Sequence, residues 1–143
     1  MHRLPLITLA LGLLGCVGCS FAGNSFTGTW TIDLRTQAER QRGAACGTAD
    51  FVLTQAGDSI AGIHSMATAG CGRLNEAGPV KGVAVGRTAI LVVTSGRNGA
   101  IAMGTARLAK GGLQWQQMEE IKAGSREGDS PLILGRGLLK REP

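Results

Sequence analysis

Short runs of alternating apolar and polar residues, separated by glycine-containing turns, make up most of the chain. In the run TGTWTIDLRT, for example, Trp30, Ile32 and Leu34 alternate with polar residues. A period of two is typical of a strand with one buried face, and turn signals recur about every 10 to 13 residues. The pattern predicts eight strands, which start near Thr27, Asp50, Ser59, Pro79, Thr88, Ala100, Leu113 and Pro131.

Eight short antiparallel strands in sequence order can close on themselves and so remove their unpaired edges. We therefore predict an all-β fold, a single eight-stranded antiparallel up-and-down barrel over residues 26–143, with a β-sandwich as the alternative. Two segments, Gln37–Gly47 and Ala69–Gly78, break the alternation and are expected to be irregular loops. The first of them is polar and is expected to hold one helical turn.

The stretch TSGRNGAIAMGT raises the question of a phosphate-binding loop. Gly99 and Gly104 have the spacing of such a loop, but Thr105 stands where the loop needs a lysine. Asn98 and Gly99 both tolerate a positive φ, and this pair is the strongest short-range signal for a hairpin. We predict a turn between two strands here.

Two neighbouring strands place polar side chains among apolar ones. The turn at Gly57 and Asp58 predicts a hairpin in which Gln55 and His64 share a face with Phe51. If that face points inward, it has the composition of a ligand pocket. The alternative is that the two polar groups satisfy each other or a buried water. Trp30 and Trp115 are the other candidate ligand-binding residues, with a core position as the alternative for Trp115.

The first residues have the features of a bacterial export signal. Arg3 precedes an apolar run from Leu4 to Leu14, which is too short to span a bilayer permanently. The run leads into LLGC, which resembles a bacterial lipobox, and the resemblance implies cleavage before Cys16 and acylation of that cysteine. Residues 1–15 are then the signal peptide, and residues 16–25 form a short tether.

The same resemblance implies a location. Several acyl chains on Cys16, palmitate among them, hold a protein stably to a membrane, because each buried methylene adds about 0.8 kcal/mol. Val17 in place of an aspartate implies sorting to the outer membrane, with the domain facing the periplasm. The alternative is ordinary cleavage after Ala22, which would release a soluble periplasmic or secreted protein.

Two further cysteines, Cys46 and Cys71, lie beyond the signal. Outside the cytoplasm, such a pair most simply forms a disulfide. It would close a loop of about 25 residues and stabilise the fold by roughly 3 kcal/mol. The alternative is a reactive thiol or a metal site.

Charge and chemistry exclude several classes of function. The formal charge of +5, or +4 for a chain that starts at Cys16, is mild and scattered, so we expect no nucleic-acid partner. We also expect no enzyme, because His64 and Ser65 would point to opposite faces of a strand, as would Glu119 and Glu120. The spacing of His, Cys and carboxylate residues is not that of a metal site, so neither a metal nor a cofactor is predicted.

The sequence GTW, Gly28 to Trp30, on the first strand resembles the start of the calycin superfamily, which includes lipocalins, avidins and small bacterial metalloprotease inhibitors. The resemblance implies a barrel in which this tryptophan closes one end of the interior. It also implies that an arginine of the last strand, Arg136 or Arg141, packs across the indole as a cation. The metalloprotease inhibitors share the exported address, the early G-x-W and one disulfide.

These features lead to the expectation of a non-enzymatic envelope lipoprotein that acts as a protein-binding module, such as an inhibitor or an immunity-type protein. The loops Gln37–Gly47 and Ala69–Gly78, which a disulfide would hold together, are the expected contact surface. The alternative function is that of a carrier with a small apolar ligand inside a lipocalin-like barrel. A third is a structural role as a packing element of a larger envelope assembly.

Overall fold

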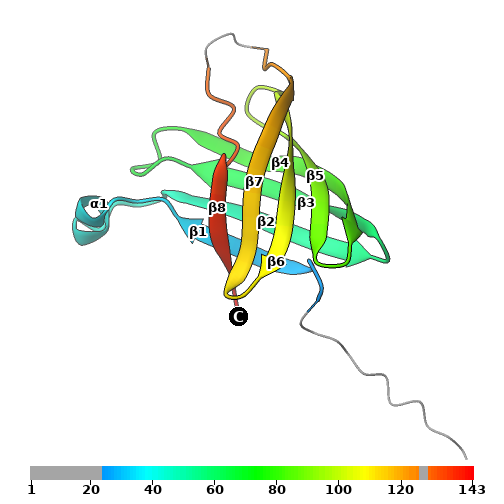
Figure 1. Cartoon of the computed structure of the whole chain (residues 1–143). Helices are drawn as coiled ribbons and strands as arrows, with labels where there is room; N and C mark the ends of the chain where they lie inside the picture. The colour runs from blue at the N-terminus through cyan, green and yellow to red at the C-terminus, as the bar shows by residue number, and fades with distance from the viewer. Residues whose placement is uncertain (1–23, 126–128) are drawn as a thin grey trace, which may run out of the picture.

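The computed structural model describes residues 24–125 and 129–143, which form a closed β-barrel with a short helix outside it (Figure 1). Each strand pairs antiparallel with its neighbours in sequence, and β8 returns to β1 to complete the ring. The up-and-down barrel is therefore confirmed in preference to a sandwich. The elements are β1 (Gly28–Asp33), α1 (Gln37–Gln41), β2 (Thr48–Ala56), β3 (Ser59–Ala67), β4 (Leu74–Val85), β5 (Thr88–Thr94), β6 (Ile101–Ala109), β7 (Gly112–Lys122) and β8 (Arg136–Arg141).

The alternation predicted for β2 and β3 is present in the barrel. Phe51 pairs with His64, and Gln55 pairs with Ile60, so these residues share one face, which turns inward. Apolar side chains from all eight strands meet in one core around them. The strand residues of this core are Trp30, Ala49, Phe51, Leu53, Ile60, Val80, Ala84, Ala89, Leu91, Val93, Ala106, Leu108, Leu113, Trp115 and Leu139.

A glycine on β6 makes room for the indole of Trp115 in this core. A Cβ atom at Gly104 would lie 2.5 Å from Cη2 of Trp115, which is closer than carbon atoms approach one another. The ring is fully buried and lies with its centroid 5.1 Å from that of Phe51. The small residue on one strand therefore allows the large residue on the next strand to fill the centre of the barrel.

The loop between β5 and β6 is the predicted turn, but it is wider than a two-residue hairpin. The backbone N–H of Ser95 donates to the carbonyl of Ala100 at 2.7 Å, and Gly99 has a φ of 74°. Asn98 keeps a negative φ and turns its side chain inward, where the Oδ1 atom accepts from the N–H of Ala100. Asn98 thus acts through its amide, and the positive φ falls on the glycine alone.

Two predicted strand starts were wrong. β4 begins at Leu74 rather than near Pro79, because the chain pairs with β3 beyond a register shift between His64 and Met66. β8 begins at Arg136 rather than near Pro131. The apolar run before it is not a strand but lies in the interior, with Leu132 and Leu134 buried and Leu132 at a φ of 50°.

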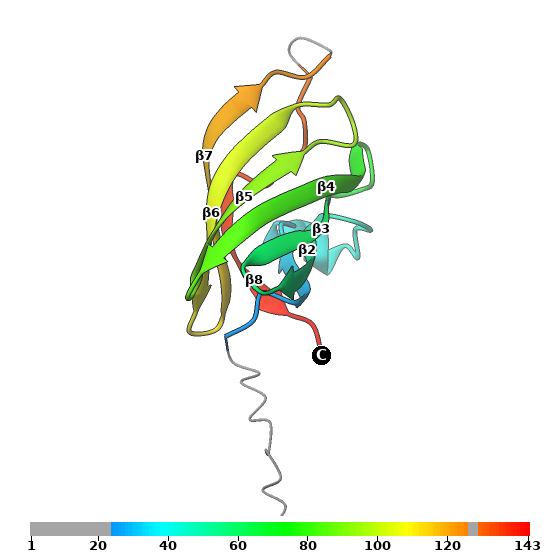
Figure 2. The same ribbon diagram turned by 90° about the vertical axis from the view of Figure 1, so that its right-hand side faces the viewer.

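The barrel has two different ends. The hairpin end carries the β2–β3, β4–β5 and β6–β7 turns, together with Asn24 and the C-terminus (Figure 2). The loop end carries α1, the segment before β4, the β5–β6 loop and residues 129–135. At the loop end, the closing segment (residues 131–134) crosses the opening of the barrel and fills it with its own side chains.

Candidate functional site

His64 lies in the interior with both ring nitrogens engaged. Its Nδ1 atom is 2.8 Å from the carbonyl oxygen of Asp50, which can only accept, so Nδ1 carries the proton. The Nε2 atom then accepts from the backbone N–H of Leu134 at 3.1 Å. Burial lowers the pKa of the imidazole, although the carbonyl of Asp50 opposes this. His64 is therefore a neutral side chain that joins β3, β2 and the closing segment.

The other three predicted ligand-binding residues also bond to the backbone. The indole N–H of Trp115 donates to the carbonyl of Leu134 at 2.6 Å, and that of Trp30 donates to Phe26 at 2.9 Å. The amide of Gln55 accepts from the N–H of Phe26 and donates to the carbonyl of Gly57. The structure brings His64 and Trp115 together beside the closing segment, whereas Trp30 and Gln55 lie at the hairpin end.

These contacts decide how the polar interior groups are satisfied. Gln55 and His64 do not bond to each other; each is satisfied by the backbone. Within residues 24–125 and 129–143, every buried side-chain nitrogen or oxygen has a hydrogen-bond partner. The stacked rings of Phe51 and His64, with centroids 4.5 Å apart, occupy the middle of the barrel. Trp30, His64 and Trp115 are therefore buried with their polar atoms satisfied, and Gln55 is partly buried at the hairpin end.

Two further buried polar residues hold the closing segment and were not expected from the sequence. Asn75 donates from Nδ2 to the carbonyl of Leu132 at 3.0 Å and accepts from the N–H of Gly96 at 2.8 Å. Ser95 donates from Oγ to the carbonyl of Pro131 at 2.7 Å. Asn75 lay in a segment predicted to be irregular, so nothing in the pattern marked it as an inward position.

The predicted disulfide is present and ties two loops together. Cys46 and Cys71 are bonded, with their Cα atoms 5.3 Å apart. The backbone supports this link, because the N–H of Gly70 donates to the carbonyl of Ala45 at 2.8 Å. The chain between β1 and β2, residues 34–47, is here called the excursion. The disulfide joins Cys46, close to where the excursion leads into β2, to the segment before β4.

The excursion projects from the barrel, as Figure 1 shows for α1. The helix lies in the segment where one helical turn was expected, and it buries no residue. A capping box opens it: the hydroxyl of Thr36 accepts from the N–H of Glu39, and the carboxylate of Glu39 accepts from the N–H of Thr36. The carboxylate of Glu39 accepts from both the N–H and the hydroxyl of Thr36, and these two bonds lower its pKa, so the carboxylate is charged and this box is intact at neutral pH.

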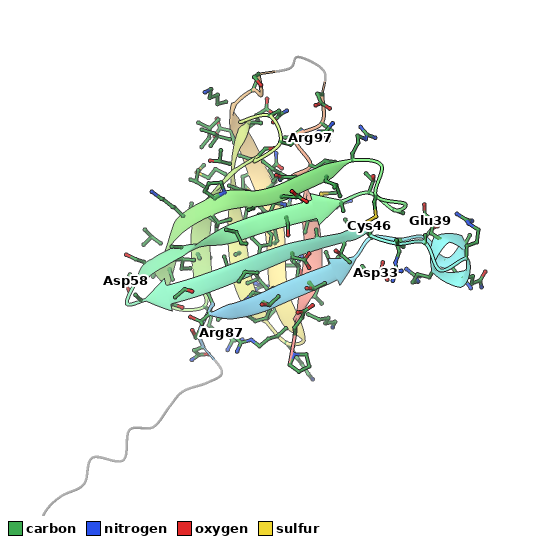
Figure 3. The ribbon with its side chains drawn as sticks, turned by 180° about the vertical axis from the view of Figure 1, so that it is seen from behind. Asp33, Glu39, Cys46, Asp58, Arg87 and Arg97 are labelled. Atoms are coloured by element: carbon green, nitrogen blue, oxygen red, sulfur yellow. A yellow bond between two sulfur atoms is a disulfide. The ribbon has the colours of Figure 1, made fainter. Side chains whose placement is uncertain are left out.

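Arg35 fixes the first part of the excursion. Its guanidinium donates through Nε and NH2 to the two oxygens of Asp33, at 3.0 and 2.8 Å. It also donates through NH1 to the carbonyl of Ala44, across the base of the excursion, at 2.9 Å. The side-chain bond from Arg35 lowers the pKa of Asp33 to about 2. Both ends of the excursion are thus connected through the side chain of Arg35. Figure 3 shows Asp33 and Cys46 near the barrel and Glu39 on the helix.

The surface of the excursion is polar and mainly basic. Arg40 and Arg42 are exposed on it, and Arg73 is exposed on the segment that the disulfide brings alongside. At its foot, where β2 begins, a depression of about 110 Å³ lies on the outside of β2, β3 and β4, with Leu74 and Met66 in its lining. The exposed cations thus lie near a small depression whose lining includes both apolar side chains and the carboxylates of Asp50 and Glu76.

In the part of the chain that the structure describes, no group of three His, Cys, Asp or Glu residues lies close enough to share a metal ion. No helix among the described residues is long and apolar enough to span a bilayer. The predicted lipidation at Cys16 and the alternative cleavage after Ala22 lie outside the described residues.

No family model, no curated protein and no solved structure matches the chain.

Proposed function

We propose that the chain is a non-enzymatic lipoprotein of the bacterial cell envelope that binds another protein through its excursion. The observation that supports this is that the excursion is fixed without contributing to the core. Its helix buries no residue, yet a capping box, the Arg35–Asp33 pair and the disulfide all hold it. A loop ordered in advance suits binding, because much of the entropy cost of association is met before the partner arrives.

The surface chemistry indicates the kind of partner. The exposed Arg40, Arg42 and Arg73 favour an acidic surface, since complementary charges speed encounter and fix orientation. The depression beside Leu74 would accept one apolar side chain of that surface. An inhibitor or an immunity-type protein is the class of binder that these features support.

The proposed location comes from the sequence. Acylated Cys16 would hold the chain to the outer membrane, with the barrel facing the periplasm and the membrane as a second partner. The calycin-like start at Gly28 to Trp30 is part of the same proposal. A carrier function would need space inside the barrel, which Phe51, His64 and Trp115 occupy, so we propose the protein-binding role alone.

The test compares charge reversal on the excursion with the same reversal on the barrel wall. Bacteria producing the full chain would be cross-linked, and the partner identified from the envelope fraction by mass spectrometry. We expect R40E/R42E to weaken affinity for the purified partner at least about tenfold, through lost complementarity. The control K81E/R107E removes two exposed cations from β4 and β6 and should change affinity less than about twofold.

A second variant tests the excursion itself. Replacing residues 36–45 by a short glycine–serine turn should abolish partner binding while the far-UV circular dichroism of the barrel is retained, because these residues bury nothing in the core. If this variant binds as well as the wild type, or if both charge-reversal pairs weaken binding equally, the excursion is not the contact surface.

A further inference from the structure

A depression at the hairpin end gathers three cationic side chains. It has a volume of about 390 Å³ and lies between the β4–β5 turn, the β6–β7 turn and the end of β8. Arg87, Lys140 and Arg141 line it, together with Trp30 and the glycines at 111 and 112. Figure 3 shows Arg87 beside the start of β1, away from Glu39 and Arg97.

Backbone carbonyls, rather than carboxylates, hold these three cations in place. Arg87 donates through Nε and NH2 to the carbonyl of Leu108, at 3.0 and 2.9 Å. Lys140 donates to Gly111 at 3.0 Å. Arg141 donates to Ser25 at 2.7 Å and stacks over Trp30 with its Cζ 4.5 Å from the ring centroid. The resemblance to calycins implied that either Arg136 or Arg141 would stack on this tryptophan, and Arg141 is the one that does.

The positive charge of the cluster is therefore not neutralised within the described residues. The ion pairs seen there join Arg35 to Asp33 and Arg97 to Asp129, and neither involves the depression. After the bonds above and one from Arg87 to Asn24, at least two N–H groups of each cation have no partner among the described residues. Guanidinium and ammonium groups that are held in place but not neutralised form a preorganised anion site.

The chemistry of the donors favours phosphate. Guanidinium groups present paired N–H donors that match phosphate oxygens, and an ammonium adds a compact charge. Gly111 carries no side chain at the rim, and a Cβ atom there would lie 3.4 Å from Nζ of Lys140, so the β6–β7 turn leaves the ammonium uncovered.

The path of the chain indicates where this phosphate comes from. Asn24 accepts from Arg87 and Ser25 accepts from Arg141, so the chain enters the barrel at the rim of the depression. Cys16 precedes Asn24 by eight residues, which span at most about 28 Å when fully extended. An anchor on Cys16 would therefore keep the hairpin end close to the membrane surface.

We propose that the depression lined by Arg87, Lys140 and Arg141 binds the phosphate of an anionic phospholipid headgroup and seats the hairpin end on the membrane. The membrane source of the phosphate rests on the lipid anchor of the proposed function, whereas the anion site rests on the cation geometry alone. The loop end, with the excursion, then points away from the bilayer.

The experiment measures binding without the acyl chains. The chain from residue 16 onward, carrying Cys16→Ser, would be mixed with vesicles of equal parts phosphatidylglycerol and phosphatidylcholine, or of phosphatidylcholine alone, and sedimented. We expect binding to the anionic vesicles only, and a roughly 20- to 30-fold loss in R87Q/K140Q at about fivefold per cation. The control R40Q/R42Q removes the same charge at the loop end and should lose less than about twofold.

A second variant covers the possibility that Arg87→Gln disturbs the β4–β5 turn. K140E changes an exposed residue and should weaken vesicle binding more than R42E does, with both variants melting like the wild type. Equal losses in the paired variants would mean a response to net charge and would overturn the site. Binding of inorganic phosphate that Arg87→Gln abolishes, without vesicle binding, would overturn the membrane source. Palmitate labelling of wild type and Cys16→Ser tests the anchor separately.

Discussion

The two nitrogens of His64 connect three parts of the chain: β3, the carbonyl of Asp50 on β2 and the N–H of Leu134. Only the neutral ring with its proton on Nδ1 can make both bonds, because Nε2 must accept. The sequence placed His64 on the correct face of the correct strand. It could not show that the partner is a backbone N–H seventy residues away, because backbone groups carry no sequence signature.

The neutral state of His64 predicts a dependence of stability on pH. Burial lowers its folded pKa below the ordinary value of 6.5, so unfolding takes up a proton in the window just below pH 6.5. Stability is then complete above pH 6.5 and falls as the pH decreases, by up to about 1.4 kcal/mol per pH unit. Urea denaturation at a series of pH values measures this fall.

His64→Gln is the control for that measurement, since it cannot gain a proton in this window. The variant should be less stable at pH 7 but should show little change between pH 6.5 and about pH 5. Asp33 and Glu39 do not interfere, because bonds from Arg35 and Thr36 lower their pKa values and move their titration to lower pH. A wild-type profile as flat as that of the variant would contradict the neutral, doubly bonded imidazole.

At the scale of elements, the strands and their order follow from alternation and turn residues, and the exceptions have physical causes. The run Pro131 to Leu134 is apolar, and apolar runs suit either a buried strand or a buried irregular segment. The difference depends on Asn75, Ser95 and His64, which bond to its backbone from three other places in the chain. The residues of the closing segment do not themselves indicate these distant partners, so the segment was predicted to be a strand.

The disulfide is the element-scale feature with the clearest energetic consequence. Cys46 and Cys71 close a loop with a sequence separation of 25, and losing this constraint should cost about 3 kcal/mol by loop entropy. We expect C46S/C71S to keep the barrel, which the strands close independently, but to unfold at lower urea concentration, with a slope that is no smaller because the unfolded chain is no longer cross-linked. Reduced wild-type protein serves as the control and should match the variant. Unchanged stability in both would contradict a loop-entropy contribution from this bond.

The whole molecule is one closed sheet around one core, which predicts a single cooperative unfolding transition. Trp30 reports on the hairpin end, where Arg141 stacks on it, and Trp115 reports on the interior next to the closing segment. Fluorescence of W30F and W115F during thermal unfolding follows each site in turn. Within each variant, fluorescence should change at the same temperature as far-UV circular dichroism. A separate transition in either variant would show that one end of the barrel opens alone.

The closing strand β8 also lies far from β1 in sequence, although the two are neighbours in space. During synthesis, β1 is made more than one hundred residues before Lys140 and Arg141, which pair with it. At about 5 to 20 residues per second, its open edge stays without its final partner for on the order of ten seconds. A chain that pairs its strands before β8 is available is therefore an unclosed sheet with an exposed edge at β1, which makes this interval the period of greatest risk of edge-to-edge aggregation.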